Sequence, residues 1–198
     1  MLSKTLIRET LIATLGTEPQ VVSITLDRLL EEGHSINEVV VIHTESSGVG
    51  EALSVLQKEF VTETYSRIRL RTVPVESQHG PIVDFHTEED LRALLGTLYR
   101  EVCRVRRDGY IVHLSISGGR KVMAIMAMVV AQLLFGPNDR VWHLFTEGWE
   151  PGAKRRLHPG VGERIWLIPI PVLRWTEAGT LMRTVAELDD PAEVVAWY

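Results

Sequence analysis

The stretch His113-Leu-Ser-Ile-Ser-Gly-Gly-Arg-Lys-Val-Met123 predicts a β-strand that turns through paired glycines into a helix. Mostly apolar residues fill positions 110–116, and a long apolar run follows Lys121. Paired glycines let the backbone turn its N–H groups outward, and a helix N-terminus adds the positive end of a dipole. Together with the lysine beside them, these groups predict a site for a phosphate or another anion.

The rest of the first 145 residues alternates apolar runs with helical patterns. The apolar runs predict strands at residues 5–13, 38–43, 68–75, 110–116 and 140–145. The helical patterns predict helices at residues 22–30, 50–60, 87–107 and 119–135. This alternation is typical of a mainly parallel sheet with helices on both faces, so we expect an α/β, Rossmann-like fold.

The last fifty or so residues break this alternation. Their predicted elements are a loop at residues 146–162, a strand at 164–172 and short helices at 177–187 and 191–198. Two prolines favour an edge position for that strand. Three cations near the tip of the loop are expected to be solvated, and the alternative is a lid that touches a phosphate: Lys154, Arg155 and Arg156. We therefore expect a Rossmann-like domain over residues 1–145 and a C-terminal extension over residues 146–198, packed on the same domain.

Composition limits the classes of function. The chain has 198 residues and a formal net charge of −5, which fits one domain and argues against duplex DNA held by a basic surface. The single cysteine, Cys103, provides no intrachain disulfide and no cysteine cluster for zinc. The seven histidines lack the spacing of a metal site, and His43 and His113 are expected in the core. We expect neither a metal nor a cofactor.

The sequence shows no targeting or membrane segment. The apolar run at residues 6–15 is broken by Arg8 and Glu9, unlike the core of a secretory signal. No run approaches the roughly 20 apolar residues of a membrane span. We expect a cytoplasmic protein without a membrane partner.

The helix predicted over residues 122–135 is apolar on nearly every side, with Gln132 as the exception. A helix without a polar face needs cover on both sides. The sheet covers one side, and a second subunit is the simplest cover for the other, so we expect a homodimer. The alternative is that the C-terminal segment of the same chain covers this helix.

Two glycine-marked turns are expected to meet in space. In an open parallel sheet, ligands bind at the carboxyl ends of the strands, where the strand order reverses. For a strand order of 3-2-1-4-5, the turns at residues 16–20 and 117–121 flank that point. Each turn also has an interpretation without a ligand, because Thr17-Glu-Pro-Gln20 fits a capping box and Gly118-Gly119 fits tight backbone packing.

These turns resemble those of the CRISPR-associated Rossmann fold (CARF) family, in particular its short, stand-alone members. The resemblance rests on Ala13-Thr-Leu-Gly-Thr-Glu-Pro-Gln-Val-Val22 with Thr25-Leu26, on Val41-Ile-His-Thr44, and on Ser115-Ile-Ser-Gly-Gly-Arg-Lys-Val-Met123. It covers roughly residues 4–145, which is the whole predicted α/β core.

The resemblance implies a function. Members of the family form two-fold dimers whose clefts join into one pocket for a cyclic oligoadenylate, often the tetra-adenylate, made by type III CRISPR complexes. Many carry a fused effector domain, and the residues after this core are too few for a typical effector nuclease. The resemblance therefore implies a metal-independent ring nuclease that converts the ligand to linear di-adenylates with 2′,3′-cyclic phosphate ends and switches the response off.

The family pattern also assigns residues. The implied catalytic residues are Thr17, which orients the 2′-oxygen or the phosphate, and Lys121, whose ammonium stabilises developing charge. The implied ligand-binding residues are Gly16, Glu18, Gln20, Thr44, Ser117, Gly118, Gly119 and Arg120. Many members have a smaller residue in place of Arg120. That departure keeps open a non-catalytic cyclic oligoadenylate sensor that regulates a partner effector. A third alternative is a small α/β enzyme for an ordinary nucleotide or a phosphorylated metabolite.

Overall fold

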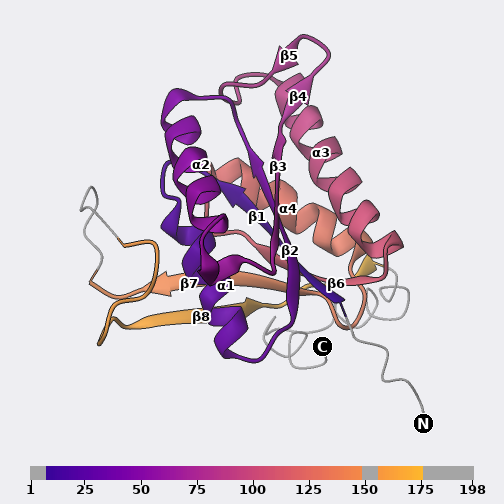
Figure 1. Cartoon of the computed structure of the whole chain (residues 1–198). Coiled ribbons are helices and arrows are strands. Elements are labelled where there is room, and N and C mark those ends of the chain that lie inside the picture. Colours follow the sequence, from indigo (N-terminus) through magenta and orange to yellow (C-terminus); the bar gives the residue numbers. More distant parts are fainter. Residues whose placement is uncertain (1–7, 149–155, 176–198) are drawn as a thin grey trace.

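The computed structural model describes residues 8–148 and 156–175, in which helices cover both faces of a central sheet (Figure 1). The strands of the sheet are β1 (Arg8–Leu15), β2 (Ile36–His43), β3 (Arg69–Pro74), β6 (Tyr110–Ser115), β7 (Arg140–Thr146) and β8 (Ile165–Ile170). The helices are α1 (Gln20–Glu31), α2 (Ser47–Phe60), α3 (Glu88–Arg107), α4 (Lys121–Leu134) and the short 3-10 helix η1 (Glu63–Tyr65). A hairpin of two short strands, β4 (Glu76–Ser77) and β5 (Gly80–Pro81), follows β3.

The strand order of the sheet is β3-β2-β1-β6-β7-β8. All neighbouring strands are parallel except β7 and β8, which are antiparallel. Apart from the small hairpin, which sequence periodicity did not predict, the first five long strands follow the expected 3-2-1-4-5 order. The predicted α/β, Rossmann-like fold is confirmed.

The strands carry two separate hydrophobic cores, because successive side chains of a strand point to opposite faces. On β1, Leu11 and Ala13 belong to the core that α1 and α2 cover, whereas Ile12 belongs to the core under α3 and α4. The central strands β1 and β2 are thus buried on both faces, as their continuous apolar runs predict. These rigid strands fix the positions of the turns that follow them.

Helix α3 begins as the sequence predicts. The Thr87 hydroxyl accepts a hydrogen bond from the Asp90 N–H at 3.2 Å, and the Asp90 carboxylate accepts one from the Thr87 N–H at 2.8 Å. This reciprocal capping box satisfies two backbone donors that have no partner within the helix.

Strand β8 occupies the edge of the sheet, which confirms the position that its prolines predict. It extends the same sheet as the preceding strands, while the domain boundary at residues 145 and 146 stays a prediction. Several other predictions concern residues outside the described ranges: the start of the first strand, the loop cations Lys154 and Arg155, and the helices at 177–187 and 191–198.

Helix α4 shows incomplete cover in the described part of the chain. Met123, Ala127 and Val130 are buried against the sheet and α3, but Ile125 is 60% exposed and Leu133 is 40% exposed. Residues 8–148 and 156–175 therefore do not bury the outer side of α4. Within those residues, no helix combines the length and apolar character that crossing a bilayer requires.

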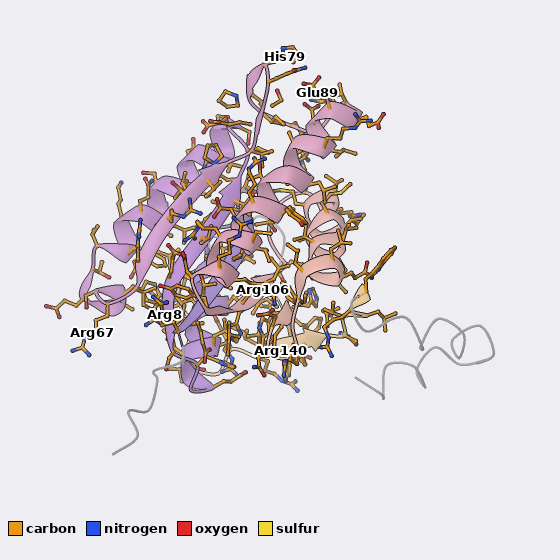
Figure 2. All side chains as sticks on the ribbon, turned by 90° about the vertical axis from the view of Figure 1, so that its right-hand side faces the viewer. Arg8, Arg67, His79, Glu89, Arg106 and Arg140 are labelled. Atoms are coloured by element: carbon orange, nitrogen blue, oxygen red, sulfur yellow. The ribbon has the colours of Figure 1, made fainter. Side chains whose placement is uncertain are left out.

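Some charged side chains mark the two ends of the molecule (Figure 2). Arg8 and Arg140, which open β1 and β7, lie at the same end as Arg106 in the last turn of α3. His79 and Glu89 lie at the other end, where their side chains approach to 3.6 Å beside the hairpin. These arginines mark the amino ends of the strands, away from the turns at the carboxyl ends, and Arg106 is paired there with Asp139.

Candidate functional site

The turns that follow β1 and β6 meet at the carboxyl edge of the sheet. The two strands are neighbours in parallel register, with Ala13 opposite Ser115, and β2 lies on the other side of β1. The strand order therefore reverses between β1 and β6. A Cβ atom built on Gly16 would stand 3.1 Å from both the Cα and the N of Gly119, so the backbones of the two turns are in contact.

Close approach of the backbone explains Gly118, and a positive φ explains Gly119. A Cβ on Gly118 would stand 2.1 Å from the carbonyl oxygen of Thr14, and a Cβ on Gly119 would stand 2.6 Å from Sδ of Met123. Gly119 also has a φ of 81°, in the left-handed region that favours glycine. The Thr14 hydroxyl donates a hydrogen bond to the Gly118 carbonyl at 2.5 Å. Local packing and backbone conformation thus account for these glycines without a ligand, and the hydrogen bond to Thr14 helps to hold the turn in place.

Two adjoining hollows open where the turns meet, and we call them together the crevice. The larger has a volume of about 310 Å³ and the smaller about 230 Å³. Both are lined by Gly16, Thr17 and Gly119. Of the other predicted residues, the larger hollow is lined by Glu18, Ser117 and Gly118. The smaller is lined by Thr44 and Arg120.

Thr17 does not cap helix α1, so the capping-box alternative is wrong. The helix begins at Gln20, its N-cap is Pro19, and no side chain makes a capping hydrogen bond. Thr17 lies two residues too early, and Gln20 is the first helical residue rather than the third. The Gln20 amide instead donates to the Glu18 carboxylate, and Gln20 is buried outside both hollows. Thr17 is exposed at the rim that the hollows share.

Ser117 has a structural partner in the next strand. Its hydroxyl oxygen accepts a hydrogen bond from the Leu144 N–H at 2.6 Å and lies 3.3 Å from Nδ1 of His143. The Ser117 side chain therefore fastens the second turn to β7. A ligand can therefore contact Ser117 only through the other hydrogen-bonding positions of the hydroxyl or through the backbone.

The two cations of the second turn are placed differently. Lys121 is the first residue of α4, and it is exposed and lines neither hollow. Arg120 lines the smaller hollow, where its Nε donates to Oδ1 of Asp84 at 3.1 Å and its Nη2 donates to Oδ2. The hydrogen bonds from Arg120, and then that from the Phe85 N–H, hold the pKa of Asp84 below its usual value. Asp84 is thus ionised at neutral pH.

A wider hollow of about 600 Å³ lies beside the β4–β5 hairpin. Its lining includes the carboxylates of Glu76, Glu88 and Glu89, with Arg92 as a cation. This excess of negative charge repels an anionic ligand. The crevice is therefore the better candidate for a phosphate-containing ligand, although it is smaller.

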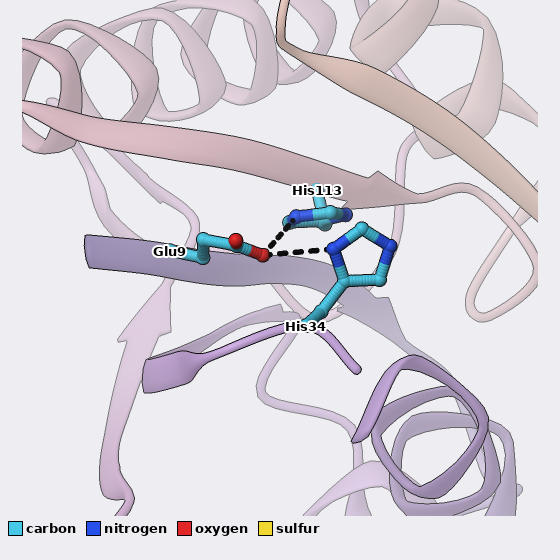
Figure 3. Close-up of side chains that lie close together, drawn as sticks. All are labelled: Glu9, His34 and His113. Carbon is cyan, nitrogen blue, oxygen red and sulfur yellow. Dashed lines mark hydrogen bonds and ion pairs between the residues drawn. The ribbon is translucent and has the colours of Figure 1, made fainter. Parts of the chain in front are cut away.

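A separate cluster consists of Glu9, His34 and His113 (Figure 3). Oε2 of Glu9 lies 2.9 Å from Nδ1 of His34 and 2.9 Å from Nε2 of His113. The three atoms lie within 4.8 Å of one another, as the ligands of a metal ion would. Sequence spacing does not reveal this cluster, because its members come from β1, the loop after α1 and β6.

The hydrogen-bond polarity of this cluster does not suit a metal ion. The indole N–H of Trp142, which can only donate, donates to Nδ1 of His113 at 3.0 Å. Neutral His113 therefore carries its proton on Nε2 and donates it to Glu9. A metal-binding histidine has the opposite arrangement, because its second nitrogen donates a hydrogen bond. Burial, and then the neighbouring His34, lower the pKa of His113 to about 4, which keeps the ring neutral.

Sequence reasoning missed several residues that line the crevice: Ser46, Val83, Leu144 and Thr146. Ser46 and Thr146 stand at or just after the carboxyl ends of β2 and β7, so the rule that parallel strands end at one edge is a signal that finds them. Val83 and its neighbour Asp84 lie in the loop between β5 and α3. A single acidic residue in such a loop forms no sequence pattern.

The sheet order and the crevice at its reversal point define a Rossmann-like α/β domain. The sequence pattern of the family described as CRISPR-associated protein NE0113 matches residues 18–198. Because that match spans most of the chain, this chain belongs to the CRISPR-associated protein NE0113 family. The CRISPR association that the two turns imply is confirmed.

A relative in Saccharolobus solfataricus, named CRISPR system ring nuclease SSO2081, is 30% identical to this chain over 125 residues. The match covers 62% of this chain and spans about 64% of the length of the relative.

Solved structures resemble this chain at lower sequence identity than that relative does. Can2 from Sulfobacillus thermosulfidooxidans in complex with cyclic tetra-adenylate has a TM-score of 0.41 and 13% identity, over 68% of this chain and 31% of that one. Csm6 from Enterococcus italicus, bound to cyclic hexa-2′-fluoro-hexa-dAMP, has a TM-score of 0.49 and 14% identity, over 72% of this chain and 35% of that one.

Proposed function

We propose that this chain binds a cyclic oligoadenylate in the crevice and cleaves it, as a ring nuclease that ends type III CRISPR signalling. One observation carries the proposal: the Gly16 and Gly119 turns meet where the strand order reverses and line two adjoining hollows. The ring nuclease named among the relatives supports this class of reaction.

The reaction needs little from the protein beyond geometry. The 2′-oxygen of a ribose attacks the adjacent phosphorus while the bond from phosphorus to the 5′-oxygen breaks. The 2′-hydroxyl loses a proton and the departing 5′-oxygen gains one, which yields a 2′,3′-cyclic phosphate and a 5′-hydroxyl. Holding the attacking oxygen in line with the leaving oxygen supplies much of the rate enhancement.

The crevice offers groups for each part of this reaction. The exposed Thr17 hydroxyl at the shared rim orients the 2′-oxygen or the phosphate. The backbone at Gly118 and Gly119 and the ammonium of Lys121 stabilise the charge that develops on phosphorus-bound oxygens. Lys121 reaches the ligand along its flexible stem, since it lies two residues beyond the lining residue Gly119. The nucleophile comes from the substrate and the counter-charge from Lys121, so this scheme requires no metal.

We also infer a two-fold dimer, in which two equivalent crevices together bind one symmetric ligand. Exposed apolar residues lie on α4 and on the same face of β7 and β8: Ile125, Leu133, Phe145, Trp166 and Ile168. The rings of Phe145 and Trp166 form a pair with centroids 5.6 Å apart. Covering these residues with a second copy brings two crevices to one ring. Two equivalent cuts in cyclic tetra-adenylate then give linear di-adenylates.

The placement of Arg120 favours a second candidate. A cation that lines the crevice strengthens retention of a polyanionic ligand, and slow release suits a sensor that signals to a partner effector. In that case the same crevice binds the ring without cutting it. A cytoplasmic location and the lack of duplex DNA binding remain predictions from the sequence.

Mass spectrometry distinguishes these functions. The protein is incubated with cyclic tetra-adenylate and, separately, cyclic hexa-adenylate in buffer with EDTA, and the filtrate and the protein-bound fraction are analysed. Linear di-adenylates that end in 2′,3′-cyclic phosphate support the ring nuclease. An intact ring that co-purifies with the protein supports the sensor, and failure to bind either ring contradicts both.

A further inference from the structure

The ion pair between Arg120 and Asp84 stands at the wall of the smaller hollow. Arg120 precedes α4, whereas Asp84 lies in the loop between β5 and α3, so the pair joins two separate parts of the crevice wall. Nε of Arg120 donates to Oδ1 of Asp84 at 3.1 Å, and Nη2 donates to Oδ2. Two parallel hydrogen bonds fix the plane of the guanidinium as well as its position.

Asp84 is itself held in place by its loop. The Phe85 N–H donates to Oδ1 of Asp84 at 2.9 Å. Two residues earlier, the carbonyl of Ile82 accepts a hydrogen bond from the Glu45 N–H at 2.8 Å, and the Ile82 N–H donates to the carbonyl of Val75 at 2.9 Å. The loop is thus fastened to the segment that follows β2, which also lines the crevice through Thr44.

The pairing leaves one edge of the guanidinium available. Arginine has five N–H donors in a fixed fork, and Asp84 takes the one on Nε and one on Nη2. The second donor on Nη2 and one donor on Nη1 form the adjacent edge, at the end of the side chain. That edge matches two oxygens of a phosphate, which arginine binds bidentately.

We propose that Asp84 is a positioning residue that aims the free edge of Arg120 at a phosphate of the ligand. This inference rests on the proposed function of the crevice and adds to it a residue for ligand orientation. The ligand class is a nucleotide phosphodiester, and Arg120 is the group that touches it.

A contribution to stability does not explain the pair. The Arg120 side chain is 68% exposed, and ion pairs in that setting contribute little to the free energy of unfolding. The charge of Asp84 does not explain the pair either, because a carboxylate near a phosphate site repels the phosphate. The gain lies in pre-orientation instead, because ordering a free arginine side chain costs up to about 30-fold in affinity.

Titration with cyclic tetra-adenylate, made with 2′-fluoro sugars so that it cannot be cleaved, tests this inference. Asp84→Ala is expected to weaken binding about tenfold with an unchanged Tm. Arg120→Ala is expected to weaken it at least as much, and the double variant no further, since Asp84 acts through Arg120. In an Arg120→Lys background, where no fork exists to orient, Asp84→Ala is expected to change affinity less than threefold.

Glu88→Ala is the matched control, because it removes one partner of the exposed Glu88–Arg92 pair on α3. It is expected to leave binding unchanged. Asp84→Ala that binds as tightly as the parent or more tightly, or effects of Asp84→Ala and Arg120→Ala that simply add, would overturn the inference. If the parent protein binds no ring of any size, the proposed function fails, and the same series is then titrated with pyrophosphate. An unchanged pyrophosphate affinity in Asp84→Ala would then overturn the positioning role as well.

Discussion

Gly16 and Gly119 are in backbone contact across the reversal point of the sheet, although they follow different strands. A Cβ on Gly16 would stand 3.1 Å from two backbone atoms of Gly119. This contact brings the predicted catalytic turn after β1 within reach of the predicted phosphate turn after β6. It is the geometric basis of the proposed site.

Gly16→Ala is expected to weaken ligand binding by about tenfold or more. Its Cβ meets backbone rather than a flexible side chain, so the turns must separate, and overpacking of this kind costs about 1–3 kcal/mol of stability. Isothermal titration with an uncleavable ring and chemical denaturation measure the two effects. Gly50→Ala is the control, because its Cβ meets nothing within 4 Å in α2; it is expected to bind normally and to be about 0.5–1 kcal/mol more stable. Equal binding by the two variants would contradict the role of the contact.

Thr14→Val is expected to lower the free energy of unfolding by about 1–3 kcal/mol, because it leaves the carbonyl of Gly118 without its hydrogen-bond donor. The shape of the side chain is preserved, so packing alone predicts almost no change. Urea denaturation measures the difference. A variant as stable as the parent would show that this hydrogen bond does not hold the second turn.

Lys121→Ala is expected to reduce the rate of ring cleavage by about 100-fold or more, while the Tm stays unchanged because the side chain is exposed. Thr17→Val is expected to reduce the rate as well, by removing the hydroxyl that orients the reacting groups. Single-turnover kinetics with cyclic tetra-adenylate give these rates. Lys58→Ala, which removes an exposed lysine from the last turn of α2, is the control. A near-parental rate in Lys121→Ala would remove that residue from the mechanism.

Acid is expected to destabilise the protein through His113. Its pKa is about 4 in the folded chain and about 6.5 when unfolded, so the unfolded chain binds the proton first as the pH falls. The stabilising contribution of the neutral ring is present above pH 6.5 and falls by roughly 3 kcal/mol between about pH 6.5 and 4. Denaturation of the parent and of His113→Gln across this range checks it. The stability difference between the two should shrink toward pH 4, and a constant difference would contradict the account.

Much of the fold can be predicted from the pattern of apolar residues. The strands β1, β2 and β6 are apolar on both faces, and each is followed along the chain by a helix. The convergence of the two turns follows from the strand order. The β4–β5 hairpin has only two residues in each strand, which is too short for a periodic pattern. The residues from Thr17 to Gln20 match the sequence pattern of a capping box, but the structure does not form one, because α1 begins at Gln20.

Tertiary partners are the part of the site that sequence does not reveal. Ser117 and Asp84 acquire their roles from Leu144 and Arg120, which no spacing rule connects to them. The same holds for the link between Glu9 and His113. Such pairs depend on the packing of whole elements, so they become visible only when the strands and helices are in place.

Nuclear magnetic resonance of the ¹⁵N-labelled protein, titrated with 2′-fluoro cyclic tetra-adenylate, tests the central claim most directly. The amide signals of Gly16, Thr17, Gly118 and Gly119 are expected to shift together with one saturation curve, while the signal of Glu9 at the opposite end of β1 stays in place. Saturable binding that leaves these four signals unmoved and shifts signals elsewhere would contradict the claim that the crevice between the turns holds the ligand.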